Sequence, residues 1–206
     1  MNLIPKESVP VWRRDGYTLR MARPEDAESY YAQNFNPLDP EAARLTGCRA
    51  DFSREEVVSF FTVCTGDPER YDLLLIDPAG RIVGESVLNE MNPELGSANF
   101  RICLFHPGER GKGIGSWVIR TTRDFAFETL RLRRLELDVF SFNPRAIRAY
   151  EAAGFVREGV LRQVIRDGDG YGDDILMAML EEDWKRAKER ERQHKLSAGR
   201  FVGGER

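Results

Sequence analysis

The sequence predicts a mixed α/β (α+β) fold built on a mostly antiparallel sheet of about seven strands. The first observation is the order of the predicted elements, β α α β β β α β α β β α, in which many strands follow one another directly. The second is a pair of turn-forming segments, residues 77–80 (DPAG) and 167–170 (DGDG), each placed between two predicted strands. Such segments join neighbouring strands into antiparallel hairpins.

The composition describes one soluble globular domain. The chain has 206 residues, of which 41% are hydrophobic and 32% charged, so it is long enough to bury a sizeable core. A net charge of -3 argues against nucleic acid as a partner, because phosphate backbones are bound through clustered positive charge. The widely spaced Cys48, Cys64 and Cys103 suggest no disulfide framework, and His106 and His194 are too separated for a metal cluster.

No segment predicts export or a membrane anchor. Residues 1–16 lack the long apolar run of a signal peptide, and no stretch of the sequence is long and apolar enough to span a bilayer. We therefore expect a cytoplasmic protein without a membrane partner.

The first quarter of the chain contains one strand and one helix. Residues 1–16, with two prolines, predict an irregular lead-in, and the alternation over residues 17–23 predicts the first strand. A helix should begin at Pro24, which is followed by two acidic residues, and end near Asn34. Residues 36–50 contain two prolines and a glycine, and we expect an irregular loop there.

A second helix and three strands should follow. Ser53, with glutamates in the next turn, opens the helix. Its apolar residues at helical spacing are Val57, Phe60, Phe61 and Cys64. Apolar runs then predict strands over residues 73–76, 82–91 and 97–105.

The next segments alternate between helix and strand. Residues 113–129 place apolar side chains on one helical face, and residues 133–140 alternate apolar and charged side chains as a strand does. Asn143 then caps a helix with proline in its first turn, and Gly154 ends it.

The chain closes with a hairpin and a charged helix. Residues 156–165 and 173–180 are the two strands of the hairpin, and a highly charged helix begins after Glu181. From Ser197 onward we expect disorder. The predicted organisation is an irregular lead-in (1–16), one folded domain (17–184), and a charged C-terminal helix with a disordered tail (185–206).

A glycine-rich segment stands out between the fourth strand and the helix after it. Gly111, Gly113 and Gly115 allow backbone N–H groups to approach an anion closely, and the following helix directs its positive dipole end to the same point. Arg110 and Lys112 add positive charge. A plain turn from strand to helix explains the isolated glycine pattern equally well.

Two nucleotide-binding motifs do not fit this segment. A Walker A loop would need a glycine at His106 and a serine or threonine at Gly113. A dinucleotide fingerprint has the spacing G-x-G-x-x-G after a first, buried parallel strand, whereas this segment reads G-x-G-x-G and follows the fourth strand.

Two segments together resemble the GCN5-related N-acetyltransferase (GNAT) family. Residues 110–115 (RGKGIG) are similar to its (Q/R)-x-x-G-x-(G/A) pyrophosphate loop, and residues 143–155 (NPRAIRAYEAAGF) look like its N-x-x-A-x-x-x-Y-x-x-x-G-F signature. The resemblance covers roughly residues 17–184, and residues 158–162 with their hairpin look most like the ribosomal-protein and spermidine acetyltransferase branch. It implies a sheet whose fourth and fifth strands splay apart to admit the pantetheine arm of acetyl-CoA.

The resemblance also implies a set of cofactor contacts. Backbone groups of Cys103, Leu104 and Phe105 should hydrogen-bond the pantetheine arm and help to polarise the thioester. The residues expected to hold the pyrophosphate are Arg110, Gly111, Lys112, Gly113, Ile114 and Gly115. The reaction needs a neutral amine, a placed carbonyl and a proton for the thiolate, and no metal.

Tyr150 is the candidate general acid for the thiolate of coenzyme A. It follows Asn143 by seven residues, about two helical turns, so both side chains should point to the same side. Asn143 would then serve as helix cap and as a cofactor contact. The alternative role for Tyr150 is that of a half-buried aromatic residue in the core.

The general base is less sharply defined by the sequence. Glu85 and Glu90 interrupt an apolar strand, and their separation of five residues places them on opposite faces. Glu85 is the candidate base, acting through water, and Glu90 is a candidate substrate contact, since it matches a position where spermidine acetyltransferase-like sequences use acids to bind cations. A solvent-facing acid is the alternative for both.

The predicted function is acetyl-CoA-dependent transfer of an acetyl group to a primary amine by direct attack in a ternary complex. The acceptor stays open among a polyamine, a protein N-terminus and small drug-like amines, and assembly into a homo-oligomer is also left open. The alternative function is a regulatory module on the same fold that binds acyl-CoA without chemistry.

Overall fold

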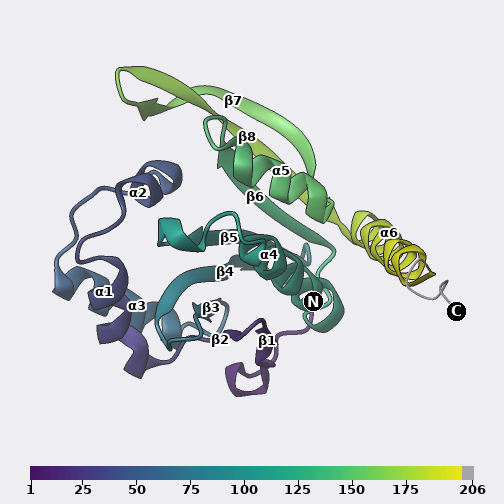
Figure 1. Cartoon of the computed structure of the whole chain (residues 1–206), viewed down its shortest axis with the longest axis horizontal. Coiled ribbons are helices and arrows are strands. Elements are labelled where there is room, and N and C mark those ends of the chain that lie inside the picture. The colour runs from purple at the N-terminus through teal and green to yellow at the C-terminus, as the bar shows by residue number, and fades with distance from the viewer. Residues whose placement is uncertain (201–206) are drawn as a thin grey trace, which may run out of the picture.

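Eight strands form one sheet in the order β1-β2-β3-β4-β5-β6-β8-β7 in the computed structural model, which describes residues 1–200 (Figure 1). Neighbouring strands run antiparallel except for β5 and β6, which are parallel. The strands are β1 Trp12–Arg14, β2 Tyr17–Met21, β3 Tyr71–Ile76, β4 Ile82–Asn92, β5 Ser97–Leu104, β6 Arg134–Phe140, β7 Val156–Asp167 and β8 Gly170–Leu180. The predicted mixed α/β class with a mostly antiparallel sheet is confirmed.

Helices cover both faces of the central strands. The helices are α1 Ala27–Asn34, α2 Pro40–Thr46, α3 Arg54–Gly66, α4 Ile114–Asp124, α5 Pro144–Ala153 and α6 Glu181–Arg200. One buried cluster joins α4 and α5 to the sheet, and a second joins α1, α2 and α3 to the other face. In β3, Leu73 and Leu75 belong to the first cluster and Leu74 to the second, which explains why this strand reads as a continuous apolar run.

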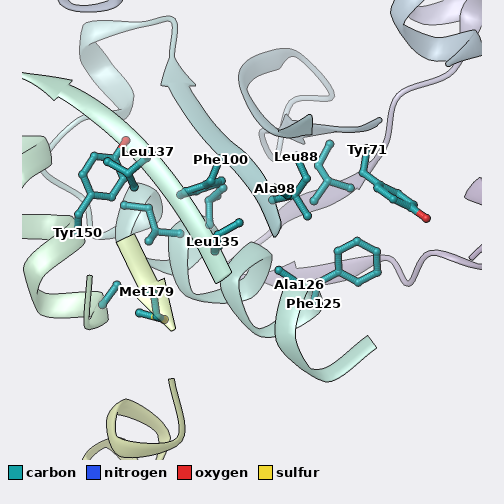
Figure 2. Packing of buried hydrophobic residues seen from close by; sticks show 14 of the residues in the cluster. Tyr71, Leu88, Ala98, Phe100, Phe125, Ala126, Leu135, Leu137, Tyr150 and Met179 are labelled. Carbon is teal, nitrogen blue, oxygen red and sulfur yellow. The ribbon is translucent and has the colours of Figure 1, made fainter. Parts of the chain in front are cut away.

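The larger cluster lies between the sheet and the helices α4 and α5. Figure 2 shows Phe100 of β5 beside Leu135 and Leu137 of β6, with Tyr150 of α5 at one end of the cluster. The Phe100 and Tyr150 rings meet edge to face, with centroids 6.2 Å apart. The helix that carries the candidate acid is therefore fixed against the sheet by its own apolar side.

Two short elements lie in segments that the sequence predicts to be irregular. β1 lies within the predicted lead-in 1–16 and pairs with β2, and α2 lies within the predicted loop 36–50. Both predictions were wrong because elements of three and seven residues are too short to show a period. The start of α2 is nevertheless capped by Asp39, whose side chain accepts a 2.9 Å hydrogen bond from the Ala42 amide.

The predicted helix ends are partly corrected. The helix expected over residues 113–129 is α4 followed by a π-helical turn at Phe125–Thr129. The charged helix expected after Glu181 is present as α6 and continues to Arg200, so disorder from Ser197 was wrong as far as residue 200. Residues 201–206 of the predicted tail lie outside the described residues. The caps predicted at Ser53 and Asn143 and the end at Gly154 are confirmed.

The two strands predicted to splay are β5 and β6, the fourth and fifth strands when counting starts at β2. Their parallel pairing joins Ser97–Asn99 only to residues 134–136 and ends there, while both strands continue for several more residues. Beyond that point one edge of β5 has no strand beside it, and a space opens between the strands. No helix within residues 1–200 is long and apolar enough to cross a membrane.

Candidate functional site

A cavity of about 470 Å³ lies at the splay between β5 and β6. Its walls come from α2, the end of β5, α5, and residues 110–115 at the start of α4, which we call the glycine turn. The residues predicted from the sequence that line it are Cys103, Leu104, Arg110, Gly111, Gly113, Gly115, Asn143 and Tyr150. Segments about thirty residues apart in the sequence thus meet at one site, because α4 and β6 carry the chain from one wall to the other.

The glycine turn has the backbone of an anion site. Gly111 and Gly113 have φ angles of +80° and +77°, and a Cβ atom at either position would have no neighbour within 4 Å. Backbone conformation rather than space therefore requires glycine at both positions. Gly113 is the N-cap of α4, so the first N–H groups of this helix and its positive dipole end face the turn.

The side chain of Arg110 is turned toward α2. It is only 7% exposed and pairs with Asp39 at 2.5 Å and with Glu41. The same guanidinium donates a 3.3 Å hydrogen bond to the Leu104 carbonyl. The positive charge that the sequence assigned to the anion site is compensated by two acids from the segment predicted to be a loop.

The side chain of Lys112 is held on the other side of the turn. Its Nζ lies 3.3 Å from a carboxylate oxygen of the buried Glu109, which also accepts a short hydrogen bond from the hydroxyl of Tyr17. This contact ties the glycine turn to β2. Sequence reasoning missed Glu109 and Tyr17 because they are 92 residues apart and neither belongs to the motif.

Two other residues of the predicted cofactor set are buried in the core. Phe105 packs edge to face on the ring of Tyr30 with centroids 5.6 Å apart, and Ile114 belongs to the cluster on the opposite face. Neither lines the cavity. The backbone N–H of Phe105 donates a 3.0 Å hydrogen bond to the Val83 carbonyl, so this group is already paired within the sheet.

Asn143 and Tyr150 both line the cavity, as their spacing of seven residues predicted. Asn143 Oδ1 accepts a 3.1 Å hydrogen bond from the Ala146 amide and so caps α5. Burial raises the pKa of the Tyr150 hydroxyl, and the negative charge of Asp138 adds to the shift. Tyr150 is thus a core aromatic that also reaches the cavity, and its phenol stays protonated at neutral pH.

Glu85 lies directly behind the cavity wall. It lies on β4 directly opposite Cys103 of the neighbouring strand β5. Its carboxylate accepts a 2.6 Å hydrogen bond from the Tyr30 hydroxyl. Burial raises the pKa of Glu85, and the hydrogen bond from Tyr30 offsets part of that shift. Burial also raises the pKa of the Cys103 thiol, with a further contribution from Glu85, so this cysteine is a neutral thiol rather than a nucleophile.

Glu90 lies apart from these groups. It is exposed, has a φ of +52°, and falls where the register between β4 and β5 shifts. Five residues of strand separate it from Glu85, which corresponds to about 16 Å. The structure does not bring Glu90 to the cavity.

The cavity offers backbone donors for an anion and the phenol of Tyr150, and the carboxyl group of Glu85 lies behind the wall formed by β5. Such an arrangement suits the transfer of a group carried on a phosphorylated ligand. Within residues 1–200 there is no group of three or more His, Cys, Asp or Glu side chains arranged to hold a metal ion.

Comparison with known sequences gives a consistent result. The model of the acetyltransferase (GNAT) domain matches residues 17–156. The chain is 27% identical over 183 residues to the SPbeta prophage-derived uncharacterized N-acetyltransferase YokL of Bacillus subtilis (strain 168), covering 86% of this chain and 97% of that protein. It is 33% identical over 105 residues to the spermidine N(1)-acetyltransferase of Vibrio cholerae, covering 51% of this chain and 60% of that enzyme.

A solved structure shares the same architecture. The crystal structure of spermidine N-acetyltransferase from Vibrio cholerae in complex with CoA and spermine superposes with a TM-score of 0.73 at 25% sequence identity. The alignment covers 83% of this chain and 99% of that one.

Proposed function

Since the chain belongs to the acetyltransferase (GNAT) family and is an N-acetyltransferase, we propose that it transfers the acetyl group of acetyl-CoA directly to a primary amine. The observation that carries this proposal is the single cavity that joins the glycine turn before α4 to Tyr150 on α5. The turn offers backbone donors for a pyrophosphate, and the splay leaves room for a pantetheine arm between β5 and α5.

The residues present fit this ligand. Backbone N–H groups around Gly111 and Gly113, together with the start of α4, would hold the pyrophosphate, because the side chains of Arg110 and Lys112 are engaged with acids. On the free edge of β5, the backbone of Leu104 would hydrogen-bond the pantetheine arm, as an added strand does, whereas the Cys103 carbonyl faces Gly84 of β4. Asn143 would contact the ligand from the opposite wall.

The reaction needs two proton transfers. Glu85, acting through a water molecule, takes a proton from the ammonium form of the acceptor, and the neutral nitrogen then attacks the thioester carbonyl carbon. As the carbon–sulfur bond breaks, the Tyr150 phenol gives its proton to the sulfur and recovers one from the new amide nitrogen through solvent. A carboxyl group whose pKa is raised by burial is a better proton acceptor for an amine than an ordinary glutamate.

We propose a cationic amine, and a polyamine in particular, as the acceptor. Two similar proteins are named as spermidine acetyltransferases, and a cation beside the half-buried Glu85 would stabilise its carboxylate. A long acceptor lying along β4 would reach Glu90 with a second amine, which is the role that remains for this residue. Two acids near the start of α3 and in the β7–β8 turn are engaged in ion pairs, Glu56 with Arg49 and Asp167 with Arg44.

The test combines ligand binding with turnover. Acetyl-CoA at about one hundred times its Kd should stabilise the native state by about 2.7 kcal/mol, which corresponds to a rise in Tm of about 5–10 °C. Release of the CoA thiol is then measured with spermidine, spermine, an aminoglycoside and a peptide with a free N-terminus. Release with the polyamines supports the proposal, and preference for the peptide or aminoglycoside changes the acceptor. Stabilisation without thiol release from any amine favours a non-catalytic acyl-CoA sensor, and no stabilisation contradicts the proposal.

A further inference from the structure

Arg123 is a fully buried positive charge that lies outside the cavity. It belongs to α4, its side chain is 0% exposed, and it contacts three helices. Within α4, Arg123 Nε donates a 2.9 Å hydrogen bond to Asp124. Its Nη1 donates a 2.7 Å hydrogen bond to the Ala153 carbonyl of α5. Its two Nη groups also donate to the two carboxylate oxygens of Glu191 in α6, at 3.0 and 3.2 Å. A buried guanidinium without such partners would be strongly destabilising.

The helices that Arg123 joins carry the two ends of the proposed cofactor site. α4 begins at Gly113, beside the glycine turn, and α5 carries Tyr150 one turn before Ala153. A ligand held at the turn must present its sulfur to Tyr150, so the relative position of α4 and α5 decides whether the phenol can reach it. The hydrogen bond from Arg123 to Ala153 fixes that position at the C-terminal end of α5, where helix carbonyls lack helical partners.

α6 holds this contact in place from outside. Residues of α6 approach the end of α5 so closely that a Cβ atom on Gly154 would lie 3.0 Å from the Ala187 Cβ. α6 is also bound to α4 by two contacts with Asp124. Trp184 Nε1 donates a 3.0 Å hydrogen bond to its carboxylate, and Lys188 Nζ donates one of 2.8 Å. Figure 1 shows α6 next to the end of α5, at the far end of β8 from the hairpin tip.

We propose that Arg123 and Glu191 are positioning residues for the acetyl transfer, which assigns a role to the charged C-terminal helix. Glu191 supplies a counter-charge from α6, in addition to Asp124 of α4, and it keeps Arg123 on the Ala153 carbonyl. This contact keeps Tyr150 in line with the thiol. The inference rests on the proposed function and extends it to Glu191, which lies beyond the segment matched by the family model, 17–156.

The first test is a double-mutant cycle between Glu191→Gln and Tyr150→Phe, since coupled residues give non-additive effects. Glu191→Gln alone should lower kcat about 10-fold, with the KM for acetyl-CoA changed less than about 2-fold, because a small misplacement affects the chemical step most. In the Tyr150→Phe background the same change should lower kcat less than about 2-fold. The matched control is Glu189→Gln, an exposed acid of the same helix that pairs with Arg192, and it should leave kcat unchanged. Equal losses in both backgrounds, or equal effects of the two glutamine variants, would overturn the proposal.

The second test does not depend on activity. Hydrogen exchange of the α5 amides, followed by mass spectrometry on peptides covering residues 144–155, should accelerate at least about 3-fold in Glu191→Gln and not in Glu189→Gln. Unchanged exchange in Glu191→Gln overturns the proposed contact whatever the kinetics show. A wild-type protein that releases no thiol contradicts the proposed function instead, and an acceleration confined to α5 would then still support Glu191 as the residue that holds this helix.

Discussion

The hydroxyl of Tyr30 on α1 donates a 2.6 Å hydrogen bond to Oε2 of Glu85 on β4. The contact joins the first helix to the strand that carries the proposed base. Burial raises the pKa of both groups. The Tyr30 hydroxyl therefore remains a donor and holds the Glu85 carboxylate in one orientation.

The pH dependence of kcat should reflect the protonation of Glu85. Because burial raises its pKa, kcat should fall as the pH drops through a value above 4.5, the usual pKa of glutamate. In Glu85→Gln the amide cannot accept the proton, so kcat should be lower and this acidic limb should be absent. The measurement is a kcat profile from pH 5 to 9 with saturating acetyl-CoA. An identical limb in Glu85→Gln would exclude Glu85 as the base.

The same pKa predicts a change in stability. A carboxyl group whose folded pKa is raised binds its proton more tightly in the native state, so stability falls as the pH rises through that pKa. Above it, Glu85→Gln should be more stable than the wild type, by about 1.4 kcal/mol for each unit by which the pKa is raised. The two proteins should have equal stability once the pH is below 4.5. Denaturant titrations at several pH values measure the difference, and a pH-independent difference would contradict the prediction.

Removal of the Tyr150 hydroxyl should affect chemistry rather than binding. Tyr150→Phe keeps the ring packed against Phe100 and loses only the proton donor, so kcat should fall about 10²-fold while the Kd for acetyl-CoA stays within about 2-fold. Single-turnover thiol release and calorimetric titration separate the two quantities. Tyr171→Phe, at an exposed tyrosine of β8, is the matched control and should behave as the wild type. Wild-type turnover in Tyr150→Phe would require another acid.

The glycine turn allows a matched pair of alanine substitutions. Gly113 and Gly80 have φ angles of +77° and +82°, and a Cβ atom would have free space at both. Gly113→Ala and Gly80→Ala should each lose about 1 kcal/mol of unfolding free energy, since alanine is strained in this backbone region. Only Gly113→Ala should weaken acetyl-CoA binding, because Gly80 lies in the β3–β4 turn. Equal binding by both variants would contradict an anion site at Gly113.

The ion pairs of Arg110 should contribute more to the free energy of unfolding than ion pairs at the surface. Its guanidinium is almost buried between Asp39, Glu41 and the Leu104 carbonyl, so Arg110→Gln should cost about 1–3 kcal/mol of unfolding free energy. Arg44→Gln, which removes an exposed pair with Asp167, should change it little. Denaturant titrations measure both variants, and a loss of the same size in both would show that α2 is not held through Arg110.

Much of the fold and part of the candidate site could be predicted from the sequence. The strands, the hairpin turns and the longer helices follow local rules of period and turn chemistry, and the structure confirms them. The glycine turn, Asn143 and Tyr150 were found because each occupies a fixed place in a local pattern, and the cavity brings them together. The family followed from the order of two such patterns.

The sequence could not give contacts between segments that are far apart in the chain. It could not show that Arg110 meets Asp39 across 71 residues. It also could not show that the Tyr30 hydroxyl meets Glu85, because α1 and β4 are 55 residues apart at this contact. Nor could it show that Arg123 is neutralised by Glu191. Period, caps and glycine conformations are set by neighbours within a few residues, whereas burial and ion pairing depend on which segments the folded chain places side by side. The sequence therefore determined the elements and the anion turn, and tertiary packing decided the charge state and the partners of the groups around them.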